Sequence, residues 1–238
     1  MKLHILAIGA HPDDVELSCS GTLLKHKSLG QKIGILDLTR GELGTRGSAA
    51  LRDEEAQNSS NVLQLDVREN LALPDGFFSN TPENQIAIIR QIRKYQPDIV
   101  LCNAIYDRHP DHGKGASLVS DACFYSGLIK IITEDDGTNQ NAWRPKFVYH
   151  YIQDRYIKPD FIVDITDYMS KKMESIHCFK SQFFDPDSIA PPTPISSKQF
   201  IEGIRNRCAE WGRIIGVEYG EGFTCERISG VQNLNHLI

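Results

Sequence analysis

Two short segments of the chain combine histidine with aspartate at spacings that can bind a metal ion. The first, residues 10–14, reads Ala-His-Pro-Asp-Asp, and the second, residues 109–112, reads His-Pro-Asp-His. An apolar, strand-like run precedes each segment, at residues 3–9 and 98–103. In an open α/β sheet, ligands bind in the crevice outside the carboxyl ends of the strands. We therefore expect the two segments to meet in one crevice and to supply the groups of a metal-assisted hydrolase.

Within these segments, His11, Asp14 and His112 form the expected set of metal ligands. The first two are three residues apart on one loop, so an imidazole and a carboxylate can bind the same ion, and His112 can supply the third ligand from the second loop. Two nitrogens and one oxygen suit Zn²⁺ and leave a coordination position open for water. Zn²⁺ lowers the pKa of such a water to about 7. Other divalent ions such as Fe²⁺ tolerate the same ligands.

The remaining acid and base groups of the two segments are candidates for proton transfer. Asp13 neighbours a ligand and can point at the attacking water, so we expect it to be the general base. His109 lies three residues before His112 and can face the same pocket without binding the ion. As a protonated imidazole it could stabilise an oxyanion and protonate a leaving amine. Asp111 or Asp107 could orient that imidazole, as an outer carboxylate does for a metal-bound histidine.

Each segment has a simpler interpretation when it is taken alone. Proline forms turns and aspartate caps helices, so a single His-Pro-Asp is more often a helix entry than a metal site. Two adjacent aspartates can also complement the dipole at a helix start. Two such segments at two expected strand ends have little structural reason to share this composition, so we favour the metal site. The first segment also lacks the G-x-G-x-x-G pattern of a dinucleotide-binding loop, and its carboxylates would repel a phosphate.

The sequence around the two segments alternates between strand-like and helix-like stretches. Strands are expected at residues 3–9, 32–38, 67–71, 97–103, 146–151 and 161–165. Helices are expected at residues 17–30, 49–65, 82–95, 111–126, 168–184 and 196–216, and residues 133–144 look like a polar insertion loop. This alternation predicts an α/β fold, a single domain over residues 1–238 with a Rossmann-like, mostly parallel sheet and helices on both faces.

Composition and charge argue against several classes of function. The net charge is −5 and the sequence pI is about 5.9, which gives no basic surface for nucleic acid. No apolar stretch approaches the roughly 20 residues needed to span a bilayer, and the N-terminal apolar run does not end at a signal-peptide cleavage site. The six cysteines are scattered without a C-x-x-C pair, which favours reduced thiols over a zinc ribbon. These features predict a cytoplasmic protein with no nucleic-acid or membrane partner.

At the two acidic-histidine segments the chain resembles the PIG-L/LmbE-like family of zinc-dependent de-N-acetylases. The resemblance extends over nearly the whole chain, and further stretches are similar to the branch that deacetylates N-acetylglucosaminyl-malate in bacillithiol biosynthesis. Those stretches are residues 39–47, 73–76, 107–112, 179–183 and 219–223. The resemblance implies an amidohydrolase that releases acetate and leaves glucosaminyl-malate. For the site it implies three metal ligands, a general base and a second catalytic histidine, namely His11, Asp14, His112, Asp13 and His109.

The implied substrate carries two carboxylates on its malyl group, and arginine binds carboxylates in bidentate fashion. Three arginines are on loops beside the expected site: Arg40, Arg46 and Arg108. We favour Arg46 and Arg108 as substrate contacts, and salt bridges to Glu42 or Asp53 are the alternative. Glu221 lies between glycines that allow close backbone approach, so it could contact sugar hydroxyls or could be a surface carboxylate.

The sequence leaves two other functions open. The same hydrolase chemistry could act on another N-acetylglucosamine conjugate or on a thiol conjugate. A non-enzymatic α/β module that binds a sugar or nucleotide is the second alternative, although the missing glycine pattern argues against a nucleotide. In each case the partner is a small molecule, and in the favoured one it is a glycoconjugate. Members of the resembled family are often oligomers, so a homo-oligomer is compatible with the sequence, and residues 133–144 could serve as an interface or a lid.

Overall fold

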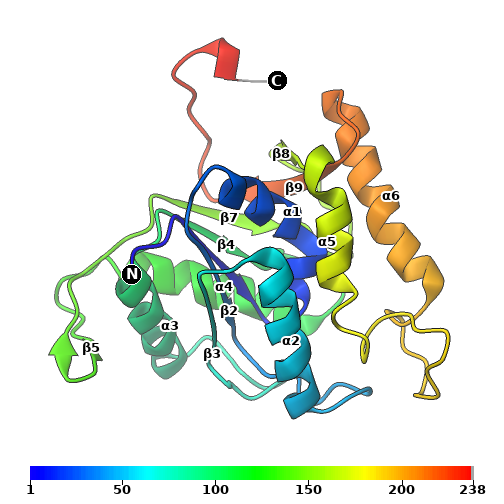
Figure 1. Ribbon diagram of the computed structural model, residues 1–238. Helices are drawn as coiled ribbons and strands as arrows, with labels where there is room; N and C mark the ends of the chain where they lie inside the picture. The colour runs from blue at the N-terminus through cyan, green and yellow to red at the C-terminus, as the bar shows by residue number, and fades with distance from the viewer. Residues whose placement is uncertain (237–238) are drawn as a thin grey trace.

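The computed structural model describes residues 1–236, which are built around one seven-stranded sheet (Figure 1). The strand order is β3-β2-β1-β4-β7-β9-β8. The bounds are β1 Ile5–Gly9, β2 Ile33–Asp37, β3 Val67–Asn70, β4 Ile99–Cys102, β7 Phe147–Tyr151, β8 Phe161–Asp164 and β9 Gly220–Cys225. The five strands from β3 to β7 pair in parallel, whereas β9 is antiparallel to both β7 and β8. The expected single α/β domain with a mostly parallel sheet is confirmed.

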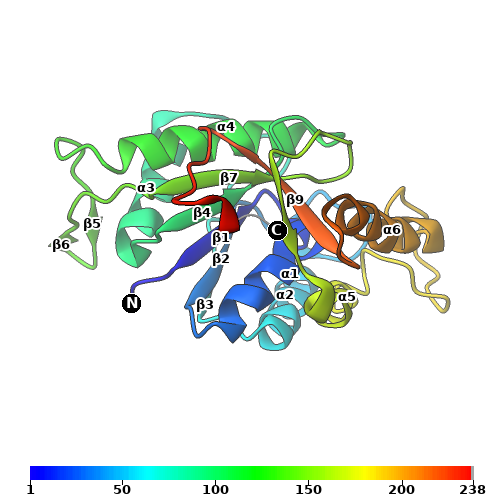
Figure 2. The ribbon, with the colours of Figure 1, turned by 90° about the horizontal axis from the view of Figure 1, so that it is seen from above.

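Helices cover both faces of the sheet, as Figure 2 shows from above. Their bounds are α1 Asp14–Ser28, α2 Ala49–Leu63, α3 Pro82–Tyr95, α4 Pro110–Tyr125, α5 Met169–Ile176 and α6 Lys198–Ile215. Helices α3 and α4 pack together on one face, α1, α2 and α5 pack together on the other, and α6 lies against β8 and β9. The chain also has two short 3₁₀ turns, at Thr166–Tyr168 and Leu234–His236.

The two hydrophobic cores follow from the two-residue period of the strands. In β1, Leu6 and Ile8 belong to the core under α3 and α4, whereas Ile5 and Ala7 belong to the core under α1. All four side chains are almost fully buried. A strand that is buried on both faces is apolar almost throughout, which is why β1 could be recognised in the sequence.

The order of the strands places a natural ligand-binding crevice at the carboxyl end of β1. From β1 the chain first builds outward through β2 and β3, and it then returns to add β4 on the other side of β1. The strand order therefore reverses between β1 and β4, and ligands bind outside the carboxyl ends of strands at such a switch point. The first acidic-histidine segment follows β1, and the second follows β4.

Three parts of the fold differ from the sequence expectations. The helix expected at 168–184 ends at Ile176, where the backbone N–H groups of Cys178 and Phe179 bond to the carbonyls of Ser175 and Ile176 in tighter turns. Further on, the backbone N–H and hydroxyl of Ser181 bond to the carboxylate of Glu55. The expected insertion loop contains a small hairpin, β5 Glu134–Asp135 and β6 Thr138–Asn139, whose Asp-Gly turn has positive φ at both residues. Strand β9 was not expected.

Other bulk expectations can be compared with the structure directly. All six cysteines are free thiols. Among the helices that the structure describes, none is both long and apolar enough to cross a membrane.

Glu221 is not a substrate contact, because it lies inside the protein rather than at its surface. Its side chain is fully buried in β9, and its carboxylate pairs with Lys172 of α5 at 2.8 Å. The same carboxylate accepts the backbone N–H groups of Gly21 and Thr22 in α1 at 3.0 and 2.7 Å. The glycines around Glu221 permit close packing against Trp211 and Ile162, not approach of a sugar.

Replacing Lys172 with methionine should strongly destabilise the fold, because the charge of Glu221 would stay buried without its partner. We expect the free energy of unfolding, measured with urea, to fall by about 3–5 kcal/mol. Lys171→Met, which removes the neighbouring exposed lysine, should change it by less than about 0.5 kcal/mol. Adding Glu221→Gln to Lys172→Met should recover part of the loss. Equal effects of the two lysine substitutions would show that the buried pair contributes no more to the free energy of unfolding than an exposed lysine does.

Candidate metal centre and active site

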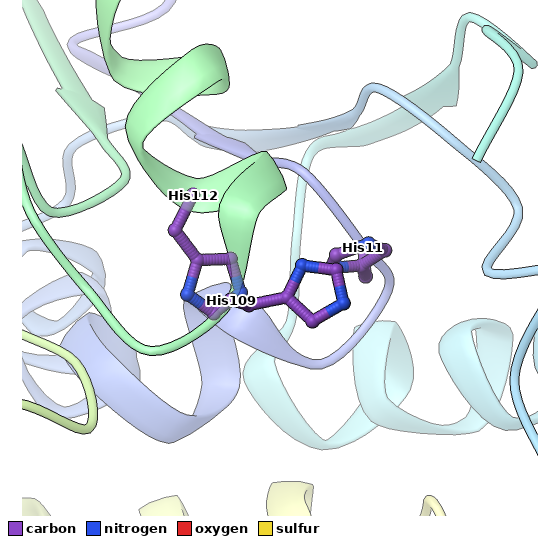
Figure 3. Close-up of side chains that lie close together, drawn as sticks. All are labelled: His11, His109 and His112. Carbon is purple, nitrogen blue, oxygen red and sulfur yellow. The ribbon is translucent and has the colours of Figure 1, made fainter. Parts of the chain in front are cut away.

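Parallel pairing of β1 with β4 brings the two acidic-histidine segments together. Ile5 lies opposite Ile99 and Ala7 opposite Leu101, so the two strands end at the same edge of the sheet. The backbone N–H of Ala10 donates to the side-chain oxygen of Asn103 at 2.9 Å, which ties the two following loops to each other. Figure 3 shows the result, with His11 from the loop after β1 facing His109 and His112 at the start of α4.

The carboxylate of Asp14 lies between the ring nitrogens of two histidines. Its Oδ1 is 3.1 Å from Nε2 of His112, and its Oδ2 is 3.5 Å from Nδ1 of His11. Side-chain amides of Asn103 and Gln153 donate to the same carboxylate at 3.0 Å each. The three groups expected to bind a metal are therefore brought together, and neighbouring hydrogen bonds fix the carboxylate among them.

Each of the two histidines has a carboxylate behind its other ring nitrogen. Nδ1 of His112 is 2.6 Å from Asp107, and Nε2 of His11 is 3.1 Å from Asp75 and 3.5 Å from Asp111. Metal-binding histidines usually donate their second N–H to a carboxylate in this way, which fixes the tautomer and turns the free nitrogen toward the ion. The donor set thus fits a divalent ion held by His11, Asp14 and His112.

The electrostatics of the site favour added positive charge. Four carboxylates lie within 4 Å of ring nitrogens of the two histidines: Asp14, Asp75, Asp107 and Asp111. Although burial lowers the pKa of His112, Asp14 and Asp107 raise it to about 9. Burial also opposes protonation of His11, but Asp111, Asp14 and Asp75 raise its pKa well above the ordinary value. A divalent ion that displaces these protons would satisfy the same carboxylates.

His109 adjoins the proposed ligands and offers a second possible ligand set. Nitrogens of His11, His109 and His112 all lie within 4.8 Å of one another. The Nδ1 atom of His109 accepts the backbone N–H of Asp111 at 3.2 Å, so the proton of the neutral ring is on Nε2. Burial, together with the neighbouring His11 and His112, lowers the pKa of His109. This favours a neutral ring over the protonated imidazole that we expected.

The carboxylates expected to orient His109 do not contact its side chain. Asp107 bonds to His112, as described above. Asp111 faces His11, accepts the backbone N–H of Gly76 at 2.7 Å and pairs with Lys114 at 3.0 Å. Asp111 therefore lies behind a proposed ligand, and it supports His109 only through its backbone N–H.

Asp13 is buried in a strained backbone conformation directly beside the proposed ligands. Its φ of 125° and ψ of −24° are rare for a residue with a side chain. Burial, and next to it the charge of Asp14, raise the pKa of Asp13 to about 7 despite the opposing charge of Arg52, whose guanidinium is 3.4 Å away. A carboxylate with a pKa near neutral can accept a proton from water and release it again, as a general base must.

A cavity of about 350 Å³ opens over these groups. Its lining includes Asp13, His109, His112 and three arginines, Arg52, Arg108 and Arg207. This volume lies within the range of small-molecule sites, and the cavity combines apolar walls with charged groups that converge on the histidines.

The two arginines predicted to contact substrate lie in different places. Arg108 lines the cavity and pairs with Asp154 at 2.9 Å. Arg46 is buried outside it and bonds to the carbonyl of Phe183 and the hydroxyl of Ser188, so its guanidinium holds the loop after α5. The prediction for Arg46 is therefore not supported. Arg40 is ion-paired with Asp53, as the alternative interpretation expected.

Several groups around the site gave no signal in the sequence. Each is a single residue outside the two motifs: Arg52, Asp75, Asn103, Gln153 and Arg207. Asp75 belongs to the Leu-Pro-Asp-Gly stretch of residues 73–76 and Asn103 ends the expected strand at 97–103, and no role was assigned to either side chain. The side chains of the others meet the site only through the tertiary fold.

Comparisons with known proteins agree with this geometry. The family model described as PIG-L, GlcNAc-PI de-N-acetylase, matches residues 6–123, from β1 to α4. The solved structure of the conserved protein TT1542 from Thermus thermophilus is 32% identical, with 97% of this chain and 98% of that chain covered and a TM-score of 0.85.

Two curated relatives have names that state a substrate. The diacetylchitobiose deacetylase of Thermococcus kodakarensis is 28% identical over 228 residues, which cover 92% of this chain and 81% of the relative. The probable N-acetyl-alpha-D-glucosaminyl L-malate deacetylase 2 of Bacillus anthracis is 24% identical over 194 residues, which cover 76% of this chain and 81% of the relative. The malate-conjugate deacetylase is thus the more distant of the two. Because the family match spans both acidic-histidine segments and the likeness to TT1542 covers almost the whole chain, this protein belongs to the PIG-L family of metal-dependent deacetylases.

Proposed function

We propose that this protein hydrolyses the acetamide of N-acetylglucosaminyl-malate and releases glucosaminyl-malate and acetate. The observation that carries the reaction type is the position of Asp14 between ring nitrogens of His11 and His112, each backed by a second carboxylate. Arginines in the cavity wall support an acidic substrate. Both named relatives are deacetylases of N-acetylglucosamine derivatives by their names, which supports the sugar.

The metal ion that the site fits would be held by His11, Asp14 and His112. Zn²⁺ is our first candidate and Fe²⁺ the alternative, because two nitrogens and one oxygen suit both. When bound, such an ion acts as a Lewis acid toward the amide carbonyl and makes water acidic near neutral pH. The hydrogen bonds of Asp75 to His11 and of Asp107 to His112 would hold both imidazoles in place for that ion.

Asp13 and His109 then act on the reacting amide from the protein side. Asp13 accepts the proton of the attacking water. The protonated carboxyl of Asp13 then donates that proton to the leaving amine. His109 presents Nε2–H, the ring position that the backbone of Asp111 leaves free, and donates a hydrogen bond to the developing oxyanion. Arg52 pairs with Asp13 and holds its carboxylate over the cavity.

Another N-acetylglucosamine conjugate is the main alternative substrate. The Thermococcus kodakarensis relative is named for diacetylchitobiose and is more similar than the malate-conjugate relative, which favours this alternative. A thiol conjugate has no comparable observation in its favour. A cytoplasmic location, also expected from the sequence, remains part of the proposal, and a homo-oligomer is compatible with it.

Substitutions of Asp14 and His109 should separate metal binding from catalysis. Asp14→Asn removes an anionic ligand, so we expect metal affinity to fall by more than about 100-fold. His109→Gln should keep one ion per chain and lower kcat by about 100- to 1,000-fold through loss of an oxyanion donor. The metal content of both variants would be measured by mass spectrometry after purification without chelator. His177→Gln, which changes an exposed histidine, is the control. Loss of the ion in His109→Gln would favour the three-histidine ligand set instead.

Asp13→Asn should abolish turnover without releasing the metal. An amide cannot accept the proton of water, and loss of a general base lowers kcat by about 100- to 10,000-fold. Acetate release and metal content would be measured on the same preparation, with Asp53→Asn on the exposed pair with Arg40 as the control. Near-normal turnover of Asp13→Asn would rule out its role as base.

The acidic substrate is tested by comparing glycosides that differ only in the aglycone. We expect kcat/KM for N-acetylglucosaminyl-malate to exceed that for methyl N-acetylglucosaminide by at least about 100-fold, as expected when paired charges are buried. Faster hydrolysis of diacetylchitobiose than of the malate conjugate would assign the alternative substrate.

A further inference from the structure

Three arginines line the active-site cavity, and only two of them are paired with a carboxylate. Arg52 is 3.4 Å from Asp13, and Arg108 is 2.9 Å from Asp154. Arg207, on α6, has no carboxylate within 4.0 Å anywhere in residues 1–236. A guanidinium that is partly buried without a counter-ion is unfavourable, and burial accordingly lowers the pKa of Arg207.

The fold satisfies another arginine without a carboxylate, and the comparison is informative. Arg93 donates to three backbone carbonyls and to the hydroxyl of Thr133, so its guanidinium is occupied on all sides by the protein. Arg207 has one such acceptor, the carbonyl of Gln153, and its guanidinium lies 5.7 Å from the ring of Trp211. None of its nitrogens is both buried and without a partner, unlike Nε of Arg52, so its remaining N–H groups are accessible, and Arg207 lines the cavity.

The position of Arg207 relative to the proposed metal centre suits the aglycone of a glucosamine conjugate. The residue that Arg207 contacts, Gln153, also donates to Asp14 and lies 3.4 Å from Nε2 of His112. Arg207 is therefore one residue away from the proposed ligands. In a 2-acetamido sugar, the carbon that bears the acetamide adjoins the anomeric carbon, so an aglycone lies close to the reacting group.

We propose that Arg207 determines specificity by binding a carboxylate of the aglycone. This inference rests on the proposed function, and it adds the residue that distinguishes an acidic conjugate from a neutral one. Arg108, already shared with Asp154 at the more exposed side of the cavity, would assist at most one further carboxylate oxygen. A planar guanidinium with free N–H groups matches a carboxylate in bidentate fashion, which a lysine at the same position would not reproduce.

The test uses Arg207→Gln and Arg207→Lys with two substrates, N-acetylglucosaminyl-malate and methyl N-acetylglucosaminide. We expect Arg207→Gln to lower the ratio of kcat/KM for the acidic over the neutral substrate by about 100-fold, mainly through KM. Arg207→Lys should recover part of that ratio, because it restores the charge without the planar fork. Arg213→Gln, which removes an exposed arginine of the same helix that pairs with Glu210, should leave the ratio at its wild-type value.

A purely structural role for Arg207 would lower kcat/KM for both substrates equally, together with the metal content, and would overturn the proposal. If the wild-type enzyme shows no preference for the acidic substrate, the malate assignment fails separately. Calorimetric titration with L-malate then judges Arg207 by itself. At least tenfold weaker binding to Arg207→Gln than to the wild type would support the carboxylate site, and equal or absent binding would overturn it.

Discussion

The carboxylate of Asp14 is the interaction on which the rest of the site depends. It lies between ring nitrogens of His11 and His112, and it accepts hydrogen bonds from the amides of Asn103 and Gln153. These partners follow three different strands, β1, β4 and β7. One carboxylate can meet all of them only if the three strand ends keep a fixed relative position. Parallel pairing of β1 with β4 and of β4 with β7 supplies that constraint, so the register of the sheet determines the geometry of the site.

Glu221 supports the proposed site without lining it. This explains why residues 219–223 stand out in the sequence although Glu221 does not contact substrate. Its carboxylate bonds to backbone N–H groups of α1, and its partner Lys172 donates to the carbonyls of Glu16 and Leu17 in the same helix. The first residue of α1 is Asp14. The buried pair therefore fixes α1, the helix that begins at the proposed ligand Asp14, against β9 and α5. A motif can thus stand out in a sequence because it positions a helix rather than because it faces a ligand.

The parts of the protein that could be predicted are those encoded by short-range patterns. The two acidic-histidine segments are contiguous, and apolar strands precede both, so a parallel sheet had to bring them together. Strand β9 escaped prediction because glycines make up part of it and because its antiparallel place between β7 and β8 depends on long-range packing. Arg52, Gln153 and Arg207 escaped for a related reason: each is an isolated residue whose side chain reaches the cavity only after distant elements pack. Arg46 had the right chemical type and the right loop, but its guanidinium turns toward the segment after α5.

The backbone of Asp13 shows how the fold accommodates its most demanding residue. A non-glycine residue in such a conformation carries strain of about 1–3 kcal/mol, and burial of its carboxylate adds a further penalty. Glycine at this position would remove both the backbone strain and the cost of burying a carboxylate, yet the residue is an aspartate. Its carbonyl accepts the N–H of Leu17 at 2.9 Å, and Arg52 binds both its carboxylate and the carbonyl of Pro12, so the surrounding contacts enforce the conformation. In the proposed roles, the turn before α1 would present a ligand at Asp14 and a base at Asp13 from adjacent positions. The strained backbone at Asp13 thus accompanies two adjacent carboxylates that both line the cavity.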